Sequence, residues 1–211
     1  MGDPDIRALI ERKLAVARPE IEPVERLLAE TEGPISAELR AWLARPQRGA
    51  AVLLALLDRP EGWRMLFTER SPHLAHHPGQ VSFPGGRIDG REDAVAAALR
   101  EAWEEVHMPP EVVEIAGQLP THVTGTGFAV TPVVGFVPGH FVPRPDPAEV
   151  ASVFEVPLEL MLEPGALRVT HHQRLGTRFK VYELEYSGRR IWGATATMLK
   201  TFIEALTDDS E

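Results

Sequence analysis

Short runs of hydrophobic residues, bounded by Gly and Pro, alternate along this chain with segments of helical periodicity. Continuous apolar runs of this length predict buried strands, and the first two are Ala51 to Leu57 and Trp63 to Thr68. The turn-forming stretch Arg59 to Gly62 separates them, which predicts a hairpin. Further strands are predicted at Glu114 to Leu119, Ala129 to Val137, Val153 to Val156, Phe179 to Tyr186 and Arg190 to Trp192.

Helical periodicity occupies both ends of the chain. The predicted helices cover Ile6 to Ala17, Pro23 to Glu30, Ala37 to Leu43 and, at the C-terminal end, Ala194 to Leu206. We therefore divide the chain into an N-terminal helical extension, residues 1–48, packed on a core of residues 49–211. Strands that flank helices in this order predict the α/β class, with an α/β/α sandwich around a mixed β-sheet.

One further helix, predicted from Glu92 to His107, carries the charges that bear on function. It is rich in alanine, lacks Gly and Pro before Pro109, and shows no capping residue. Because residues three and four apart share a helix face, Glu101 lies with Glu104 and Glu105. Such carboxylates repel one another by roughly a few tenths of a kcal/mol per pair unless a cation lies between them. Oxygen ligands favour Mg²⁺ or Mn²⁺, and the alternative is a solvated acidic face.

The turn Phe83-Pro84-Gly85-Gly86, which follows a strand-like run from Gln80, leads into this helix. Glycine lets the backbone approach a ligand closely, so a main-chain carbonyl here can face the same cation as the carboxylates. Turn and helix together resemble the Nudix hydrolase signature. The matching residues are Gly86, Glu92, Arg100, Glu101, Glu104, Glu105 and Met108. Two positions depart from it, because Ala102 is small where a larger apolar residue is usual and His107 replaces the final glycine.

The resemblance implies hydrolysis of a nucleoside diphosphate linked to another group, assisted by Mg²⁺ or Mn²⁺. The family's metal ligands fall on Glu101, Glu104 and Glu105, and the carbonyl of Gly86 is a further candidate. Arg100, counted with the catalytic residues, would pair with Glu92 and orient the carboxylates.

The general base in this family is a helix Glu or a carboxylate from a later loop. Glu149, beyond the proline-rich stretch Pro138 to Pro147, is the candidate for the loop version. The alternative is that Glu149 is a solvent-exposed residue without a catalytic role. Pro138 to Pro147 itself is expected to form a loop beside the site or a stiff connection.

The segment Leu66 to Gly86 resembles a second motif, found in the coenzyme A pyrophosphatases of the same family. The matching residues are Leu66, Thr68, Arg70, Ser71, Gly79, Phe83, Pro84, Gly85 and Gly86. Ala75 departs from the motif because an Arg is expected there, and Ala cannot donate to a phosphate. His73, His76 and His77 are nearby imidazoles that could donate instead, and the alternative for them is a surface loop without a ligand.

This second resemblance implies cleavage of coenzyme A into 4′-phosphopantetheine and adenosine 3′,5′-bisphosphate. The expected substrate-binding residues are Arg70, Ser71, His73, His77, Arg87, Thr124, Gly125 and Phe128. The last three could also be a turn and a core aromatic residue. The competing functions are a Nudix enzyme acting on ADP-ribose or a dinucleotide and a non-catalytic nucleotide-binding module, and retention of all three carboxylates argues against the module.

Composition limits the partners and the compartment. The chain has 211 residues, 44% of them hydrophobic, and a formal net charge of −9, which does not favour nucleic acid or an anionic membrane as a partner. The absence of Cys excludes disulfides and thiol chemistry, and no apolar run approaches the length of a membrane span. We expect a cytoplasmic enzyme with a small-molecule nucleotide substrate, and the family resemblance allows a homodimer.

Overall fold

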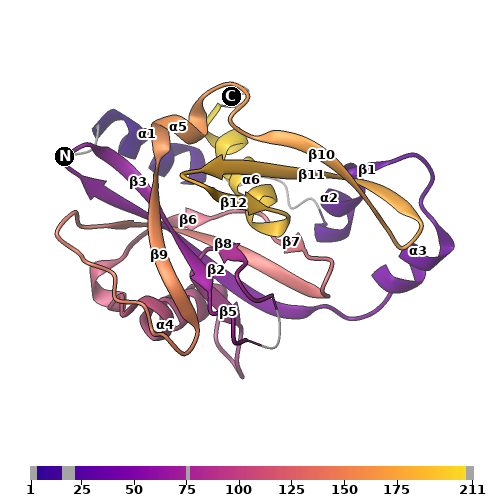
Figure 1. Cartoon of the computed structure of the whole chain (residues 1–211), viewed down its shortest axis with the longest axis horizontal. Coiled ribbons are helices and arrows are strands. Elements are labelled where there is room, and N and C mark those ends of the chain that lie inside the picture. Colours follow the sequence, from indigo (N-terminus) through magenta and orange to yellow (C-terminus); the bar gives the residue numbers. More distant parts are fainter. Residues whose placement is uncertain (1–3, 16–21, 75–76, 208–211) are drawn as a thin grey trace.

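The computed structural model describes residues 4–15, 22–74 and 77–207, and its centre is an eight-stranded mixed sheet (Figure 1). Strands β2, Arg48–Arg59, and β3, Gly62–Arg70, form the predicted hairpin, with Arg59 paired to Gly62 across a two-residue turn. Strand β8, Phe128–Val137, runs parallel to β2 along nearly its whole length. The β2–β8 pair therefore makes the sheet mixed, as the sequence predicts.

The remaining strands of this sheet are short or lie at its edges. They are β4 (Val81–Ser82), β5 (Gly85–Arg87), β6 (Glu114–Gln118), β7 (His122–Val123) and β9 (Val150–Pro157). Strand β5 pairs antiparallel with the start of β2, and β9 pairs antiparallel with β3. The start of β2 therefore lies between β8 and the glycine turn, and this position fixes the site described below.

Helices cover both faces of the sheet, which confirms the predicted α/β/α sandwich. Alternate residues of β2 face opposite sides, so Leu53 packs in the cluster that contains helix α4 while Leu54 packs in the other cluster. Helix α4, Ala94–Val106, covers the first face. On the second face lie helices α6 (Ala194–Thr207) and α1 (Pro4–Ala15). Because both faces are covered, β2 is buried on both sides, which explains its uninterrupted apolar run.

A second, four-stranded antiparallel sheet lies beside the first (Figure 1). Its strands are β10 (Arg168–Arg174), β11 (Thr177–Tyr186), β12 (Arg189–Trp192) and β1 (Thr31–Glu32). Strand β10 was not expected, because it is polar and mostly exposed and therefore carries no apolar pattern. The sheet joins β1, from the N-terminal extension, to the last third of the chain.

The N-terminal segment is helical, as predicted. Helices α2 (Pro23–Ala29) and α3 (Ala37–Leu43) lie close to their expected bounds, and the end of the first predicted helix, residues 16–17, lies outside the described residues. Ile10 of α1 is fully buried in the core beside β6 and α6. The boundary at residue 48 stays a prediction. A short 3₁₀ helix, Pro110–Val112, and helix α5, Leu158–Leu162, complete the fold. Among the described residues, no helix is long and apolar enough to cross a bilayer.

The start of α4 corrects the expectation of an uncapped helix. Asp93 is the N-cap residue, and its carboxylate accepts a hydrogen bond from the Ala96 N–H at 2.8 Å. Asp93 lies inside the range predicted as helical, and the predicted start at Glu92 was two residues too early, so its capping role was missed. The cap sets where the first turn begins, and with it the direction in which the carboxylates project.

His107 ends α4 in the left-handed conformation that glycine usually adopts, with φ 52° and ψ 40°. Its N–H donates to the Trp103 carbonyl, which is the single bond of the αL motif, and the Met108 N–H donates to the Ala102 carbonyl. His107 Nδ1 lies 2.9 Å from the Arg144 carbonyl oxygen. The chain thus leaves the helix as a glycine would let it, with a side-chain contact in addition.

Candidate active site

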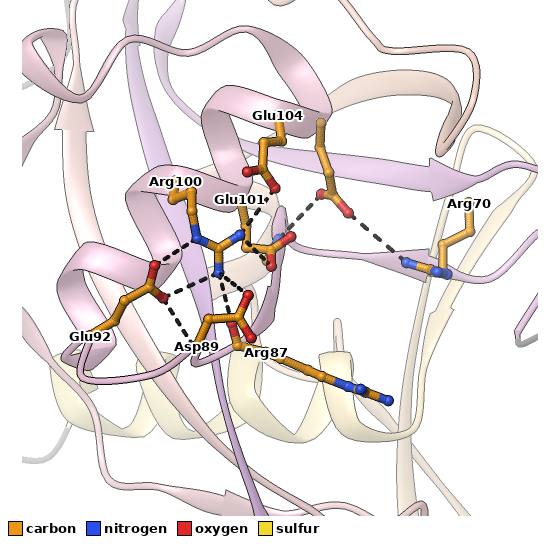
Figure 2. Close-up of polar contacts among 9 residues, drawn as sticks. Arg70, Arg87, Asp89, Glu92, Arg100, Glu101 and Glu104 are labelled. Carbon is orange, nitrogen blue, oxygen red and sulfur yellow. Dashed lines mark hydrogen bonds and ion pairs between the residues drawn. The ribbon is translucent and has the colours of Figure 1, made fainter.

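The Arg100 guanidinium on α4 donates hydrogen bonds to three carboxylates and a carbonyl, and the Asp89 carboxylate lies 4.0 Å from its Nη2 (Figure 2). Its Nε and Nη2 donate to the two oxygens of Glu92 at 2.8 and 3.2 Å. Its Nη1 donates to Glu101 at 2.9 Å and to Glu104 at 3.0 Å. Nη2 also donates to the Arg87 carbonyl at 2.9 Å. The rigid fork of a guanidinium therefore ties the middle of α4 to the end of β5 and to the loop between them.

Glu105 is the most buried carboxylate of the group, with 2% of the residue exposed. It accepts a hydrogen bond from the Gly85 N–H at 3.2 Å, and Arg70 Nη1 lies 3.9 Å from its other oxygen. Burial raises the pKa of Glu105 to about 8, although the Gly85 N–H and Arg70 lower it. A buried carboxylate with so few donors has less compensation than its ionised form requires.

The two glycines of the turn let the carboxylates come this close to the sheet. A side chain at Gly86 would occupy the space of the Glu101 carboxylate, and one at Gly85 would strike the backbone of β2 at Ala51 and Val52. Gly85 also has a φ of +155°, which side-chain-bearing residues rarely adopt. The Gly86 carbonyl as a metal ligand stays a prediction.

We call Glu101, Glu104 and Glu105 the acidic group, and their carboxylate oxygens are suited to bind a divalent cation. Within the described residues, no three acidic or histidine side chains converge as a ready-made metal site, and Glu101 and Glu104 both contact Arg100 Nη1. The atoms that these carboxylates offer to a metal are nevertheless all oxygens, which hard cations prefer as ligands. Burial raises the pKa of Glu101, and Arg100 opposes that shift. A cation would add positive charge beside the buried Glu105, for which Arg70 at 3.9 Å gives little compensation.

The loop between β8 and β9 lies against the end of α4, as the prediction of a loop beside the site requires. The Arg144 N–H donates to the Val106 carbonyl at 3.0 Å, and the Asp146 N–H donates to the Glu105 carbonyl at 2.9 Å. Glu149 follows, and its charge raises the pKa of both Glu101 and Glu105. Its side chain is exposed. The structure therefore brings Glu149 to the carboxylates, while its role as general base stays a prediction.

The segment that resembles the second motif borders the same carboxylates. Arg70 faces Glu105, and the N–H of the buried Ser71 donates to the Glu149 carbonyl at 2.8 Å. His73 and His77 are exposed in the loop that follows β3. Ala75 and His76 lie outside the described residues. Arg70 and Ser71 are thus at the site, and a substrate-binding role for His73 and His77 stays a prediction.

Thr124, Gly125 and Phe128 form a separate group beside the start of β2. The Thr124 hydroxyl accepts a hydrogen bond from the Phe128 N–H at 3.2 Å, which closes the loop between β7 and β8. Arg87 links this group to the carboxylates. Its carbonyl accepts from Arg100, while its side chain extends away from them (Figure 2) and its Cζ lies 5.7 Å from the centre of the Phe128 ring.

Sequence reasoning missed two arginines of this second group. Arg48 stacks on Phe128, and Arg174 donates to the Gly125 carbonyl. Arg48 precedes the first apolar run and Arg174 lies in the strand that was not predicted, so no local pattern marked either residue. Only the pairing of β2 with β8 and the reach of the β10–β11 hairpin bring them together.

Comparisons with known proteins agree with this geometry. The NUDIX domain matches residues 46–174, a range that contains the glycine turn, α4 and the loop that ends at Glu149. A protein named "Uncharacterized Nudix hydrolase NudL" from Salmonella paratyphi B is 44% identical over 155 residues, which are 73% of this chain and 80% of that protein.

Two solved structures are among those similar to the chain. A Nudix hydrolase from M. smegmatis, RenU, has a TM-score of 0.47 and 25% identity, covering 55% of this chain and 74% of that one. A C. elegans Ap4A hydrolase binary complex has a TM-score of 0.46 and 21% identity, and the match covers 52% of this chain and 80% of that one.

Proposed function

This chain belongs to the Nudix family and is a pyrophosphohydrolase, and we propose that its substrate is coenzyme A or a coenzyme A derivative. Enzymes of this family act on small-molecule nucleotides and typically use divalent metal ions. Cleavage of the pyrophosphate of coenzyme A would release 4′-phosphopantetheine and adenosine 3′,5′-bisphosphate.

The proposed substrate is supported by the contacts that the second motif makes with Glu105. The segment Leu66 to Gly86, whose motif resembles that of coenzyme A pyrophosphatases, reaches Glu105 from both of its ends. Arg70 approaches one carboxylate oxygen, and the Gly85 N–H donates to the other. A motif that borders the carboxylates on two sides is placed to contact the pyrophosphate and the groups next to it. Arg70, which is partly exposed, is the residue we assign to a phosphate oxygen.

We assign Mg²⁺ or Mn²⁺ to Glu101, Glu104 and Glu105, with the Gly86 carbonyl as a further ligand. When bound, such a cation neutralises charge on phosphate oxygens and lowers the pKa of a water molecule. Arg100 keeps Glu101 and Glu104 on the side of α4 that faces the turn. Glu149, whose exposed carboxylate lies near Glu101 and Glu105, would accept the proton of the attacking water.

Ala75 favours a second candidate substrate. An Arg at this position would offer a forked, permanently charged donor to a phosphate, and Ala offers none. A related Nudix reaction on ADP-ribose or a dinucleotide would need the same metal and carboxylates but different contacts in this loop. The two candidates therefore differ in the loop after Arg70 and agree at α4.

A product assay separates the candidates. The purified protein is incubated with coenzyme A, ADP-ribose and a dinucleotide, each with Mg²⁺ or Mn²⁺, and the products are identified by mass spectrometry. We expect phosphopantetheine from coenzyme A. Cleavage of only the other two substrates would refute the proposal and assign the change to Ala75. An Ala75→Arg variant then tests the position directly, because activity on coenzyme A should rise if the missing guanidinium limits it.

A further inference from the structure

Two arginines lie over the Phe128 ring, and a third contacts the loop just before it. The Cζ of Arg48, the first residue of β2, lies 4.1 Å from the centre of the Phe128 ring, and that of Arg87 lies 5.7 Å away. Arg174, the last residue of β10, donates from Nη2 to the carbonyl of Gly125, three residues before Phe128. We call Arg48, Arg87 and Arg174 the arginine cluster.

The arginine cluster lacks the anionic partners that other arginines of this protein have. In the part of the chain that the structure describes, none of its guanidiniums lies within 4.0 Å of a carboxylate oxygen. Arg48 donates to the Thr126 carbonyl at 3.3 Å, and all three side chains are exposed. Each guanidinium carries five N–H donors, so most of them face solvent. On a chain of net charge −9, this is a local region of positive charge that attracts an anion.

The arginine cluster lies next to the acidic group, and Arg87 belongs to both. The Arg87 carbonyl accepts from Arg100, and its side chain extends away from the carboxylates toward Phe128 (Figure 2). Strand pairing fixes the arrangement, because Arg48 pairs with Phe128 and Ala50 pairs with Arg87. The arginine cluster is therefore about one arginine side chain away from the carboxylates, within reach of a nucleotide whose pyrophosphate lies at α4.

We propose that the arginine cluster binds a phosphate monoester of the substrate, separate from the pyrophosphate that is cleaved. This rests on the proposed function, and in coenzyme A the group is the phosphate on the ribose 3′ oxygen. Guanidiniums bind phosphate oxygens through paired N–H donors, and stacking on Phe128 holds the Arg48 plane in place. Gly125 gives Arg174 its access, because a side chain there would collide with the guanidinium.

Two nucleotides that differ by one phosphate test the site without turnover. Binding of adenosine 3′,5′-bisphosphate and of AMP to the full chain with Mg²⁺ is measured by calorimetry. We expect the bisphosphate to bind about tenfold more tightly or better, as one charge-assisted contact would give. Arg48→Gln and Arg174→Gln should each remove most of this preference. Arg12→Gln makes the same charge change on the exposed face of α1 and should keep it. Equal affinity of the unaltered protein for both nucleotides would overturn the proposal.

Kinetics with coenzyme A and dephospho-coenzyme A separate this proposal from the proposed function. The ratio of kcat/KM for the two substrates should fall about tenfold in Arg48→Gln, through KM. Gly125→Ala should lower the ratio too, because only the flexible end of Arg174 must move. Equal cleavage of both substrates by the unaltered protein would reject the phosphate site and keep the proposed function. Absence of coenzyme A cleavage, with the bisphosphate preference dependent on Arg48, would reject the substrate and keep the phosphate site.

Discussion

The acidic group on α4 and the arginine cluster around Phe128 are neighbours, yet their charges are balanced in opposite ways. Around α4, the Arg100 guanidinium contacts Glu92, Glu101 and Glu104, so each of its edges meets an anion. Around Phe128, the guanidiniums meet only backbone carbonyls and a ring. The positive charge of Arg100 is thus paired with carboxylates of the protein, whereas the arginine cluster has no carboxylate partner among the described residues.

This difference indicates what each group is suited to bind. Glu105 is buried with little compensation, so the acidic group attracts a cation. The arginine cluster is exposed and positive, so it attracts an anion. The net charge of −9 alone would suggest a surface that repels every nucleotide. The local arrangement matters more than the sum, because charges further apart than about 8 Å are screened at physiological salt.

Glu104→Gln should have the largest effect, because it removes one charge from the acidic group and keeps the shape of the side chain. We expect activity to fall by about 100-fold or more, since even residues that only support a metal ligand are worth about 10- to 100-fold. Glu104 is half exposed, so the melting temperature should change little. Glu163→Gln makes the same change at an exposed position beyond α5 and should keep full activity. A fully active Glu104→Gln would refute the ligand assignment.

His122 is a buried side chain that can lose its charge, and the cations Arg26 and Lys200 act on it. Burial lowers the pKa of His122 to about 4, with Arg26 and Lys200 adding to the shift. The unfolded chain therefore binds a proton near pH 6.5, while the folded protein does so only near pH 4, and stability must fall as the pH falls between these values. We expect a loss of about 2 to 3 kcal/mol in unfolding free energy between pH 7 and 4.5.

Urea unfolding at several pH values tests this expectation. Other carboxylates also titrate in the same range, so the His122 contribution is the difference between the protein and a His122→Gln variant. The Gln amide can keep the contact that His122 Nε2 makes with the Thr201 hydroxyl at 3.1 Å. The variant should lose less stability at low pH than the unaltered protein. An identical pH dependence of the two would contradict the assignment.

Arg100→Lys tests whether the acidic group depends on the shape of its cation or only on its charge. A Lys ammonium is a compact charge, and it cannot contact Glu92, Glu104 and the Arg87 carbonyl at once as the fork does. We expect kcat/KM to fall about tenfold, the lower part of the range for residues that orient metal ligands. Circular dichroism should show unchanged helix content. Activity equal to that of the unaltered protein would show that charge alone is sufficient.

The acidic group could be predicted from the sequence because its parts are local. Helix periodicity places Glu101, Glu104 and Glu105 on one face, and a glycine turn precedes them within twenty residues. The β2–β3 hairpin was equally accessible, since apolar runs and the turn at Pro60 and Glu61 are local signals.

The arginine cluster could not be predicted in this way. Arg48, Arg87 and Arg174 are far apart in the sequence. Only strand pairing brings Arg48 and Arg87 to the Phe128 ring, and only the β10–β11 hairpin brings Arg174 to the Gly125 carbonyl. Strand β10, which carries Arg174, is exposed and polar, so it lacks the hydrophobic alternation that identifies a strand. Sites built from distant exposed residues leave no periodic signal, and the structure is needed to find them.

Substitution of His107, at the end of α4, should have the smallest effect, and that effect is on stability. His107 stands where the family signature has glycine, and it adopts the left-handed conformation with φ 52°. That conformation costs a side-chain-bearing residue about 1 kcal/mol, which glycine avoids. His107 recovers part of this cost through Nδ1, which lies 2.9 Å from the Arg144 carbonyl, and through its ring contact with Trp103.

Two variants separate these terms. His107→Gly removes both the strain and the contact, and His107→Ala keeps the strain and removes the contact. Urea unfolding should therefore rank Gly above Ala by about 1 kcal/mol, with the native His between them or level with Gly. If Ala equals His, the contact with the Arg144 carbonyl contributes nothing to stability. The β8–β9 loop would then be held against α4 by its backbone bonds to Glu105 and Val106 and by the packing of Phe141, without help from the His107 side chain.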